Sequence, residues 1–219
     1  MKLAIFDFDG TLFLDQTVPF ILEKFTELGY PKHRQTRVKR ALLFLFFQYK
    51  VLKKYDRESF RAIASKKVLK LFEGFSKDEV TEFFEALKIE VMPLIDQEVL
   101  MALRQKRQEG FETVLLSGCY DVMLAPLKEA LGVDRIISTK FTLGELVTVS
   151  GREKVKALWE NYNPDEIDLE ASYAYGDSIY DEFVLDLVGH PVMVNPEEDG
   201  RVFAGEKGYE VWQTRKNSV

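Results

Sequence analysis

The chain of 219 residues has little cysteine, little histidine and no long hydrophobic run. Its single cysteine, Cys119, excludes an internal disulfide, and no basic segment with an apolar signal core opens the sequence, so we expect a reduced, cytoplasmic setting. Only two histidines are present, which argues against a histidine-rich metal site. The longest dense apolar stretch, residues 41–47, is far shorter than the roughly 20 residues that span a bilayer, so we expect no stable membrane insertion.

Charge is divided unevenly along the chain. The net charge is −6, yet residues 31–70 hold 13 Lys or Arg against two acidic residues, which gives +11 there and −17 over the rest. Such a split indicates that the two parts have separate roles. The basic stretch has two interpretations: solvated helix faces, or positive charge that steers anionic substrates toward a site. We expect no nucleic-acid partner, and the sequence assigns no oligomeric state.

The pattern of apolar residues divides the chain into a helical part and a mixed part. A short apolar run at 3–6 predicts a buried strand. Patterns typical of helices follow at 18–29, 40–55, 57–75 and from 76 onward. The last of these begins with the S-x-x-E spacing of a capping box. From residue 96 on, helical patterns alternate with strands, expected at 112–117, 135–139, 146–149, 172–176, 191–195 and 209–212.

This alternation predicts an α/β fold, a doubly wound and mainly parallel sheet with an all-helical insertion of roughly 80 residues after the first strand. We expect residues 1–14 and 92–219 to form the core domain and residues 15–91 a small helical cap domain. The apolar run at 41–47 is expected in the buried core of the cap, because it lacks a clean polar face. Docking on an anionic membrane surface, or contact with a lipid phosphate, is the alternative.

Two carboxylates, Asp7 and Asp9, stand one residue apart where the first strand ends. In an open parallel sheet, ligands bind outside the carboxyl ends of the strands, where loops and helix N-termini with free N–H groups converge. The placement therefore favours a functional site. The alternative is an Asp9-Gly10 turn that closes a hairpin.

Further polar groups follow expected strands or open expected helices: Ser117-Gly118, Lys154, and Gly176-Asp177 with Asp181. Alone, each has an ordinary structural explanation as a helix cap or a surface lysine. Together with the first pair, they supply what displacement at phosphate requires: a carboxylate nucleophile, an acid for the leaving oxygen, ligands for a hard cation and donors for the phosphoryl oxygens. Asp7 and Asp177 are the ligand type that Mg²⁺ prefers.

These groups resemble the motifs of the haloacid dehalogenase (HAD) superfamily of phosphohydrolases, and look most like its phosphoserine-phosphatase-like branch (subfamily IB) with a helical C1 cap. Residues 7–11, DFDGT, match the family pattern Asp-x-Asp-x-Thr/Val. Ser117, Lys154 and the pair Asp177 and Asp181 match the next three motifs in family order. The resemblance covers nearly the whole chain and implies a HAD-like Rossmannoid core.

The resemblance also implies chemical roles. Asp7 would attack phosphorus and form an aspartyl-phosphate, while Asp9 would protonate the leaving alkoxide and later deprotonate water. Mg²⁺ would be held by Asp7, the backbone carbonyl of Asp9, and Asp177, with Asp181 as a further ligand or a support. Thr11 would orient the loop.

For the phosphate group, the resemblance implies binding by Ser117, the N–H of Gly118, and Lys154. Lys156 and Lys140 are rivals for the lysine position. A motif position just inside a helix favours Lys154.

Two positions bear on reaction and substrate. The family's dehalogenases have no acid two residues after the nucleophile, because a halide needs no proton to leave, so Asp9 favours a phosphate ester; burial in a closed site would raise its pKa toward neutrality. Family phosphoserine phosphatases have a glutamate that meets the substrate's ammonium group, where this chain has Gln16, which makes phosphoserine less favoured. Tyr180 replaces an asparagine common in the fourth motif.

We therefore expect a Mg²⁺-dependent phosphomonoester hydrolase whose partner is a small-molecule phosphomonoester. The substrate stays open among a small phosphorylated metabolite, an amino-alcohol phosphate such as histidinol phosphate, and a lipid head group. Two other functions stay open as well: a phosphate-binding or regulatory module without turnover, and a sugar phosphomutase with the same motifs.

Overall fold

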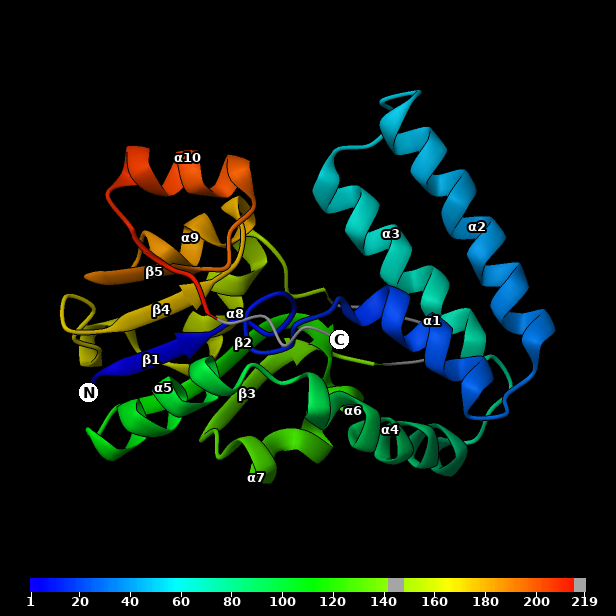
Figure 1. Cartoon of the computed structure of the whole chain (residues 1–219), viewed down its shortest axis with the longest axis horizontal. Helices are drawn as coiled ribbons and strands as arrows, with labels where there is room; N and C mark the ends of the chain where they lie inside the picture. Colours follow the sequence, from blue (N-terminus) through cyan, green and yellow to red (C-terminus); the bar gives the residue numbers. More distant parts are fainter. Residues whose placement is uncertain (142–147, 215–219) are drawn as a thin grey trace.

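The computed structural model describes residues 1–141 and 148–214. Its centre is a six-stranded sheet in the order β3-β2-β1-β4-β5-β6, in which all neighbouring strands are parallel (Figure 1). The strands are β1 (Leu3–Phe6), β2 (Glu112–Tyr120), β3 (Arg135–Thr139), β4 (Tyr173–Gly176), β5 (His190–Val194) and β6 (Glu210–Trp212). The predicted doubly wound α/β fold is confirmed, and the parallel pairing of β1 with both neighbours excludes a hairpin at its end.

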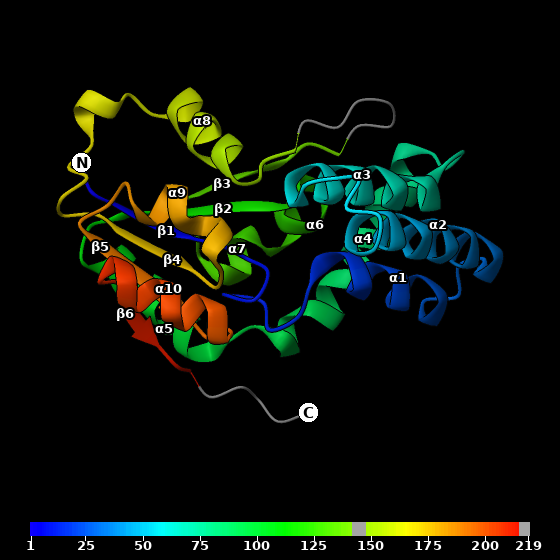
Figure 2. The ribbon, with the colours of Figure 1, turned by 90° about the horizontal axis from the view of Figure 1, so that it is seen from above.

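Each face of the sheet is covered by helices, because the strands are apolar on both sides. In β1, Ala4 and Phe6 belong to one buried cluster and Leu3 and Ile5 to another. The first cluster includes side chains of α5 (Gln97–Gln108), α6 (Asp121–Leu124) and α7 (Lys128–Leu131). The second includes side chains of α8 (Arg152–Asn161), α9 (Glu182–Leu185) and α10 (Glu198–Lys207). Helices α9 and α10 lie above the sheet in Figure 1, opposite α5 and α7, and in front of it in Figure 2, where it is seen from above.

Several element boundaries differ from the sequence prediction. The helical pattern between the strands at 112–117 and 135–139 predicts one helix over 121–132, but Pro126 stands in a 3-10 turn that separates α6 from α7, since proline disrupts a helix interior. Helix α10 was missed, and two glycines weaken its helical signal. The strand expected at 146–149 begins outside the described residues, and residues 148–149 are not in a strand. The 3-10 segments are Lys70–Phe72, Met92–Leu94, Ala125–Leu127, Pro164–Glu166 and Ile179–Asp181.

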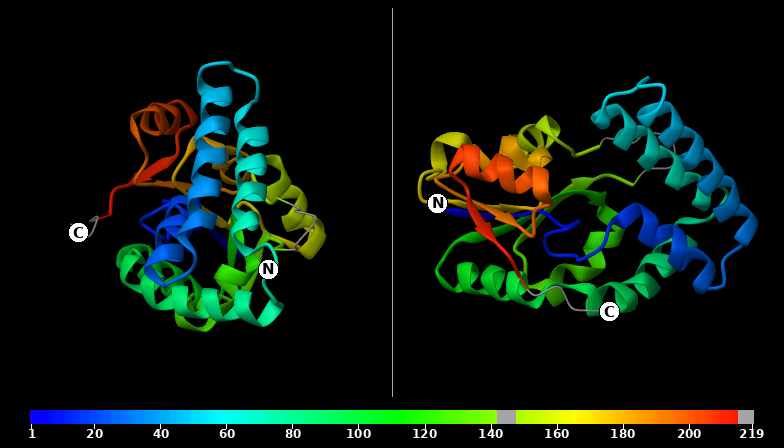
Figure 3. Two further views of the ribbon diagram at one scale, coloured as in Figure 1. Left: turned by 90° about the vertical axis from the view of Figure 1, so that its right-hand side faces the viewer. Right: turned by 45° about the horizontal axis from the view of Figure 1, so that its top comes forward.

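Residues 17–94 consist of helices joined by turns, which agrees with the predicted helical insertion after the first strand. The α-helices are α1 (Thr17–Glu27), α2 (Lys32–Lys50), α3 (Arg57–Leu69) and α4 (Lys77–Val91). Helices α1 to α3 stand beside the sheet, while α4 lies alongside α6 (Figures 1 and 3). The expected capping box at the start of α4 is present: Ser76 Oγ accepts from Glu79 N, and Ser76 N donates to Glu79 Oε2. One buried cluster runs through these helices and one face of the sheet, so the proposed division into two domains stays a prediction.

The expectation that residues 41–47 are buried is wrong. Leu43, Phe44, Phe46 and Phe47 are 69%, 61%, 49% and 47% exposed, and only Leu45 among the run's large side chains is fully buried. Helix α2 lies at the outer side of the cap, and α1 and α3 cover only part of it (Figure 3). An apolar strip with lysines and arginines near it therefore faces outward. Among the described residues, no helix is long and apolar enough to cross a membrane.

Candidate active site

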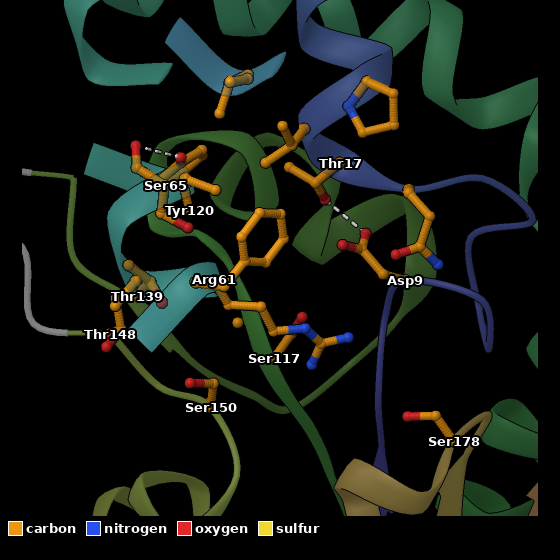
Figure 4. A pocket seen from close by; sticks show the side chains of 18 of the residues that line it. Asp9, Thr17, Arg61, Ser65, Ser117, Tyr120, Thr139, Thr148, Ser150 and Ser178 are labelled. Atoms are coloured by element: carbon orange, nitrogen blue, oxygen red, sulfur yellow. Dashed lines mark hydrogen bonds between the residues drawn. The ribbon is translucent and has the colours of Figure 1, made fainter. Parts of the chain in front are cut away.

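The carboxyl ends of the central strands and the cap helices enclose a cavity of about 630 Å³. β1 leads into Asp7 and Asp9, β2 carries Ser117, and β4 leads into Asp177. Eight of the nine residues predicted for the site line this cavity: Asp7, Asp9, Gln16, Ser117, Gly118, Lys154, Asp177 and Asp181. Figure 4 shows part of the lining, with Asp9 and Ser117 on its core side.

A buried ammonium group joins two of the carboxylates. Lys154 Nζ lies 2.6 Å from Asp7 Oδ1 and 2.7 Å from Asp181 Oδ1, and all three side chains are buried. Burial alone would lower the pKa of Lys154, but Asp181 and Asp7 raise it above its ordinary value, so the lysine stays charged. The rivals Lys156 and Lys140 have side chains 68% and 70% exposed, so Lys154 is the lysine that belongs to the site.

Three carboxylates could hold a metal ion together. Asp7, Asp177 and Asp181 each offer an oxygen, and these oxygens all lie within 4.8 Å of one another. The set is made of hard oxygen donors, which fits Mg²⁺ and does not fit a metal that prefers sulfur or imidazole. Asp181 is held in place by its Oδ2, which accepts from Ser178 N (3.4 Å) and Ser178 Oγ (3.2 Å).

Burial and the closeness of other carboxylates raise the pKa values of Asp7 and Asp177. Burial raises the pKa of Asp177 to about 8, and the negative charges of Asp181 and Asp7 add to the rise. Burial also raises the pKa of Asp7 above its ordinary value, although the neighbouring Lys154 opposes this. Carboxylates packed this closely bind either protons or cations, so the cluster has an intrinsic preference for a positive ligand.

Asp9 is set apart from this cluster and bonded to the cap. Thr17 Oγ1, at the start of α1, donates to Asp9 Oδ1 (2.5 Å; Figure 4). Burial raises the pKa of Asp9 to about 7, with the Thr17 bond opposing and the Asp7 charge adding to the rise. The expectation of a raised pKa agrees with this. A carboxyl group with such a pKa can both give and take a proton near neutral pH.

Two of the three predicted phosphate-binding residues, Ser117 and Gly118, lie where β2 leaves its regular register with β3. The pairing shifts between Ser117 and Tyr120, and Ser117 is almost fully buried with its Oγ accepting from Cys119 N (3.1 Å). Gly118 has little room, because a Cβ there would lie 3.3 Å from the Val149 carbonyl oxygen. Ser117 and Gly118 both line the cavity at this irregular point of the strand.

The DFDGT loop depends on its glycine. Gly10 has φ +78°, and a Cβ at this position would lie 2.2 Å from Asp177 Oδ2. Thr11 is fully buried and does not line the cavity, and its hydroxyl has no hydrogen-bond partner among the described residues. Its N–H donates to the Phe8 carbonyl oxygen (3.2 Å), so the loop is held by main-chain bonds. The predicted orienting role of the Thr11 side chain stays a prediction.

Sequence reasoning missed two contacts from the cap. Thr17 was not among the predicted site residues, and its bond to Asp9 was not foreseen. Arg61 of α3 points into the cavity, with its guanidinium 5.2 Å from the centre of the Tyr180 ring (Figure 4). The only signal was the basic character of residues 31–70 as a whole. Arg61 is a cation on the cap side that faces the acidic core side.

A parallel sheet with carboxylates and a lysine at its carboxyl edge, covered by helices, fits the motif pattern described above for the haloacid dehalogenase superfamily. Residues 4–182 match the sequence pattern of the haloacid dehalogenase-like hydrolase family, and the chain belongs to that family. One curated relative is an inhibition of morphological differentiation protein of Streptomyces azureus, 28% identical over 64% of this chain and 54% of its own. The chain thus spans about half the length of that relative. Another is a histidinol-phosphatase of Neisseria meningitidis serogroup C (strain 8013), 27% identical over 96% of this chain and 97% of its own.

Solved structures share the fold. A protein of unknown function from Bordetella pertussis Tohama I superposes with a TM-score of 0.80 at 21% identity, over 96% of this chain and 97% of that one. A structure described as a phospho-aspartyl intermediate analogue of phosphoserine phosphatase gives a TM-score of 0.67 at 17% identity, over 98% and 94%.

The substitution Gly10→Ala should disturb the acidic cluster. The added Cβ overlaps the Asp177 carboxylate, so Asp177 must move and Mg²⁺ affinity, measured by titration calorimetry, should fall by about 10- to 100-fold. Gly29→Ala is the matched control, because Gly29 also has positive φ (+85°) but a Cβ added there would meet nothing within 4 Å. Equal Mg²⁺ affinity in the two variants would contradict the placement of Asp177 against Gly10.

Proposed function

We propose that this protein is a Mg²⁺-dependent phosphomonoester hydrolase that works through an aspartyl-phosphate on Asp7. The observation that carries the proposal is the charged cluster of Asp7, Lys154 and Asp181, with Asp177 beside it and Asp9 within the same cavity. In this proposal the helices of residues 15–91 are a cap over a core of residues 1–14 and 92–219.

Asp7, Asp177 and Asp181 would hold the Mg²⁺, and the Asp9 carbonyl is proposed as a further ligand. When bound, Mg²⁺ supplies positive charge that offsets the negative charge of the phosphoryl oxygens. Ser117, the Gly118 N–H and Lys154 would bind the remaining phosphoryl oxygens. Lys154 already lies 2.6 Å from Asp7 Oδ1, so a phosphoryl group transferred to Asp7 would lie next to an ammonium group.

The first step is displacement at phosphorus. A carboxylate oxygen of Asp7 forms a bond to phosphorus as the bond from phosphorus to the ester oxygen breaks. Asp9, whose raised pKa of about 7 keeps a substantial fraction of it protonated near neutral pH, gives its proton to that oxygen, so the alcohol leaves neutral. The hydrogen bond from Thr17 holds the Asp9 carboxyl group in place.

The second step restores the enzyme. Asp9, now a carboxylate, takes a proton from a water molecule whose oxygen attacks phosphorus, and the bond from phosphorus to the Asp7 oxygen breaks. Phosphate leaves, and Asp7 and Asp9 return to their starting states. The names histidinol-phosphatase for a full-length relative and phosphoserine phosphatase for a structural neighbour support the assignment to phosphomonoesters of small metabolites.

Asp7→Asn should lower phosphate release from p-nitrophenyl phosphate by at least about a thousandfold, because an amide is a poor nucleophile. The measurement compares wild type and variant with Mg²⁺ and with excess chelator, and thermal unfolding checks that the variant is folded. Near-normal hydrolysis by the variant would exclude Asp7 as the nucleophile. Wild-type protein that binds phosphate without hydrolysis would instead favour the binding-module function, and turnover that needs a sugar bisphosphate would favour a mutase.

Asp9→Asn should separate the two steps. With p-nitrophenyl phosphate, whose leaving group needs no proton, the first step should survive while the second slows, so nitrophenolate should appear as a rapid burst of about one per protein before a slow rate. With an alkyl phosphate, whose leaving group needs the proton, the rate should fall by about 10²- to 10⁴-fold without a burst. Stopped-flow absorbance measures the nitrophenolate burst, and phosphate release measures the rate with the alkyl ester. An equal fall in rate for both esters, with no burst, would refute the role of Asp9.

A further inference from the structure

The cavity is much larger than a phosphate site requires. Its volume of about 630 Å³ lies in the range of roughly 300–1,000 Å³ typical of pockets for whole small ligands. The carboxylates, Lys154 and Ser117 line the core end. The cap end is therefore open to the organic part of a substrate.

The cap lines its end of the cavity mainly with apolar side chains. All three helices α1 to α3 contribute: Val18, Pro19, Leu22, Leu42, Leu43, Phe46, Phe60, Ala62 and Ala64. Burial of an apolar group against such a wall is favourable, by an amount that grows with each methylene buried. The wall thus selects for an apolar organic part.

The charged side chains of the lining also differ between the core end and the cap end of the cavity. Among the described lining residues, every carboxylate belongs to the core end, while the cap adds the cations Lys39 and Arg61. An ammonium group at the cap end would lose its hydration beside two cations and without a carboxylate partner. Phosphoserine and histidinol phosphate both carry an ammonium group, so this lining disfavours both. The same cations favour a phosphoryl dianion that enters from the cap side.

The apolar wall continues to the surface. Leu43 and Phe46 line the cavity and are also 69% and 49% exposed, so they form an edge where the cavity meets solvent. The outer strip of α2 begins at this edge. An apolar chain longer than the cavity can leave along the exposed apolar side chains of this strip.

We propose that the substrate is a phosphomonoester of an apolar alcohol, held with its phosphoryl group at Asp7 and its hydrocarbon part against the cap wall and the Leu43–Phe46 edge. This deepens the proposed phosphatase function and rests on it. Both a dissolved alkyl or aryl phosphate and a lipid phosphate have this chemistry.

Binding of n-alkylphosphonates from ethyl to octyl tests the proposal, because their carbon–phosphorus bond makes them resistant to phosphatases. Titration calorimetry with Mg²⁺ should show the dissociation constant falling by about fourfold for each added methylene that is buried. The double variant Leu43→Asn with Phe46→Asn should reduce this gain for the longest members to less than about twofold, and both positions are exposed enough to keep the fold. Phe44→Asn is the matched control, because Phe44 is exposed on the same helix and does not line the cavity.

Equal affinity along the series, or the same gain in the double variant, would overturn the proposal. So would a higher kcat/KM for phosphoserine or histidinol phosphate than for octyl phosphate. The proposed function fails separately: if the phosphonates bind with the expected gain but no phosphomonoester is hydrolysed, the apolar site stands and the hydrolase assignment falls.

A last comparison distinguishes the source of the substrate. Dodecyl phosphate is offered in phosphatidylcholine vesicles and, at the same total concentration, below its aggregation limit in buffer. Hydrolysis from vesicles supports the proposal with a lipid as the source. Hydrolysis of the dissolved ester alone supports the proposal with a soluble molecule as the source. If the protein hydrolyses ethyl phosphate but dodecyl phosphate in neither form, the proposal is contradicted.

Discussion

The site depends on one buried ion pair network, in which Lys154 lies between Asp7 and Asp181. Without that ammonium group, carboxylates from two separate segments, one after β1 and one after β4, would repel one another in a place where water screens them poorly. Removing one partner of a buried pair typically destabilises a protein by about 3–5 kcal/mol, because the other charge is left uncompensated. The network therefore ties β1, α8 and the segment after β4 into one rigid edge.

The core of the site was predictable because its signals are local. Residues 7–11 directly follow an apolar strand, and a parallel sheet brings such strand ends to one edge. The preference for Lys154 over Lys156 rested on its position in a helix, and only packing gives it two carboxylate partners. The contacts of Thr17 and Arg61 had no local signal, since they depend on how α1 and α3 fold back toward the sheet.

The cap shows where sequence patterns mislead. Residues 41–47 are apolar enough for a protein core, yet their burial depends on how many neighbours surround α2, and that helix lies at the outer side. The core end of the cavity is polar and charged, and the cap end is mainly apolar. In the function proposed above, catalysis would therefore depend on the core residues and substrate selectivity on the cap residues.

The stereochemical course at phosphorus tests the central claim, the covalent intermediate on Asp7, most directly. A phosphomonoester made chiral with oxygen isotopes is hydrolysed by the Mg²⁺-loaded wild-type protein in isotopically labelled water, and the configuration of the released phosphate is determined by phosphorus NMR. Two successive in-line displacements, first by Asp7 and then by water, predict net retention. Net inversion would mean that water attacks the ester directly, and would contradict the account.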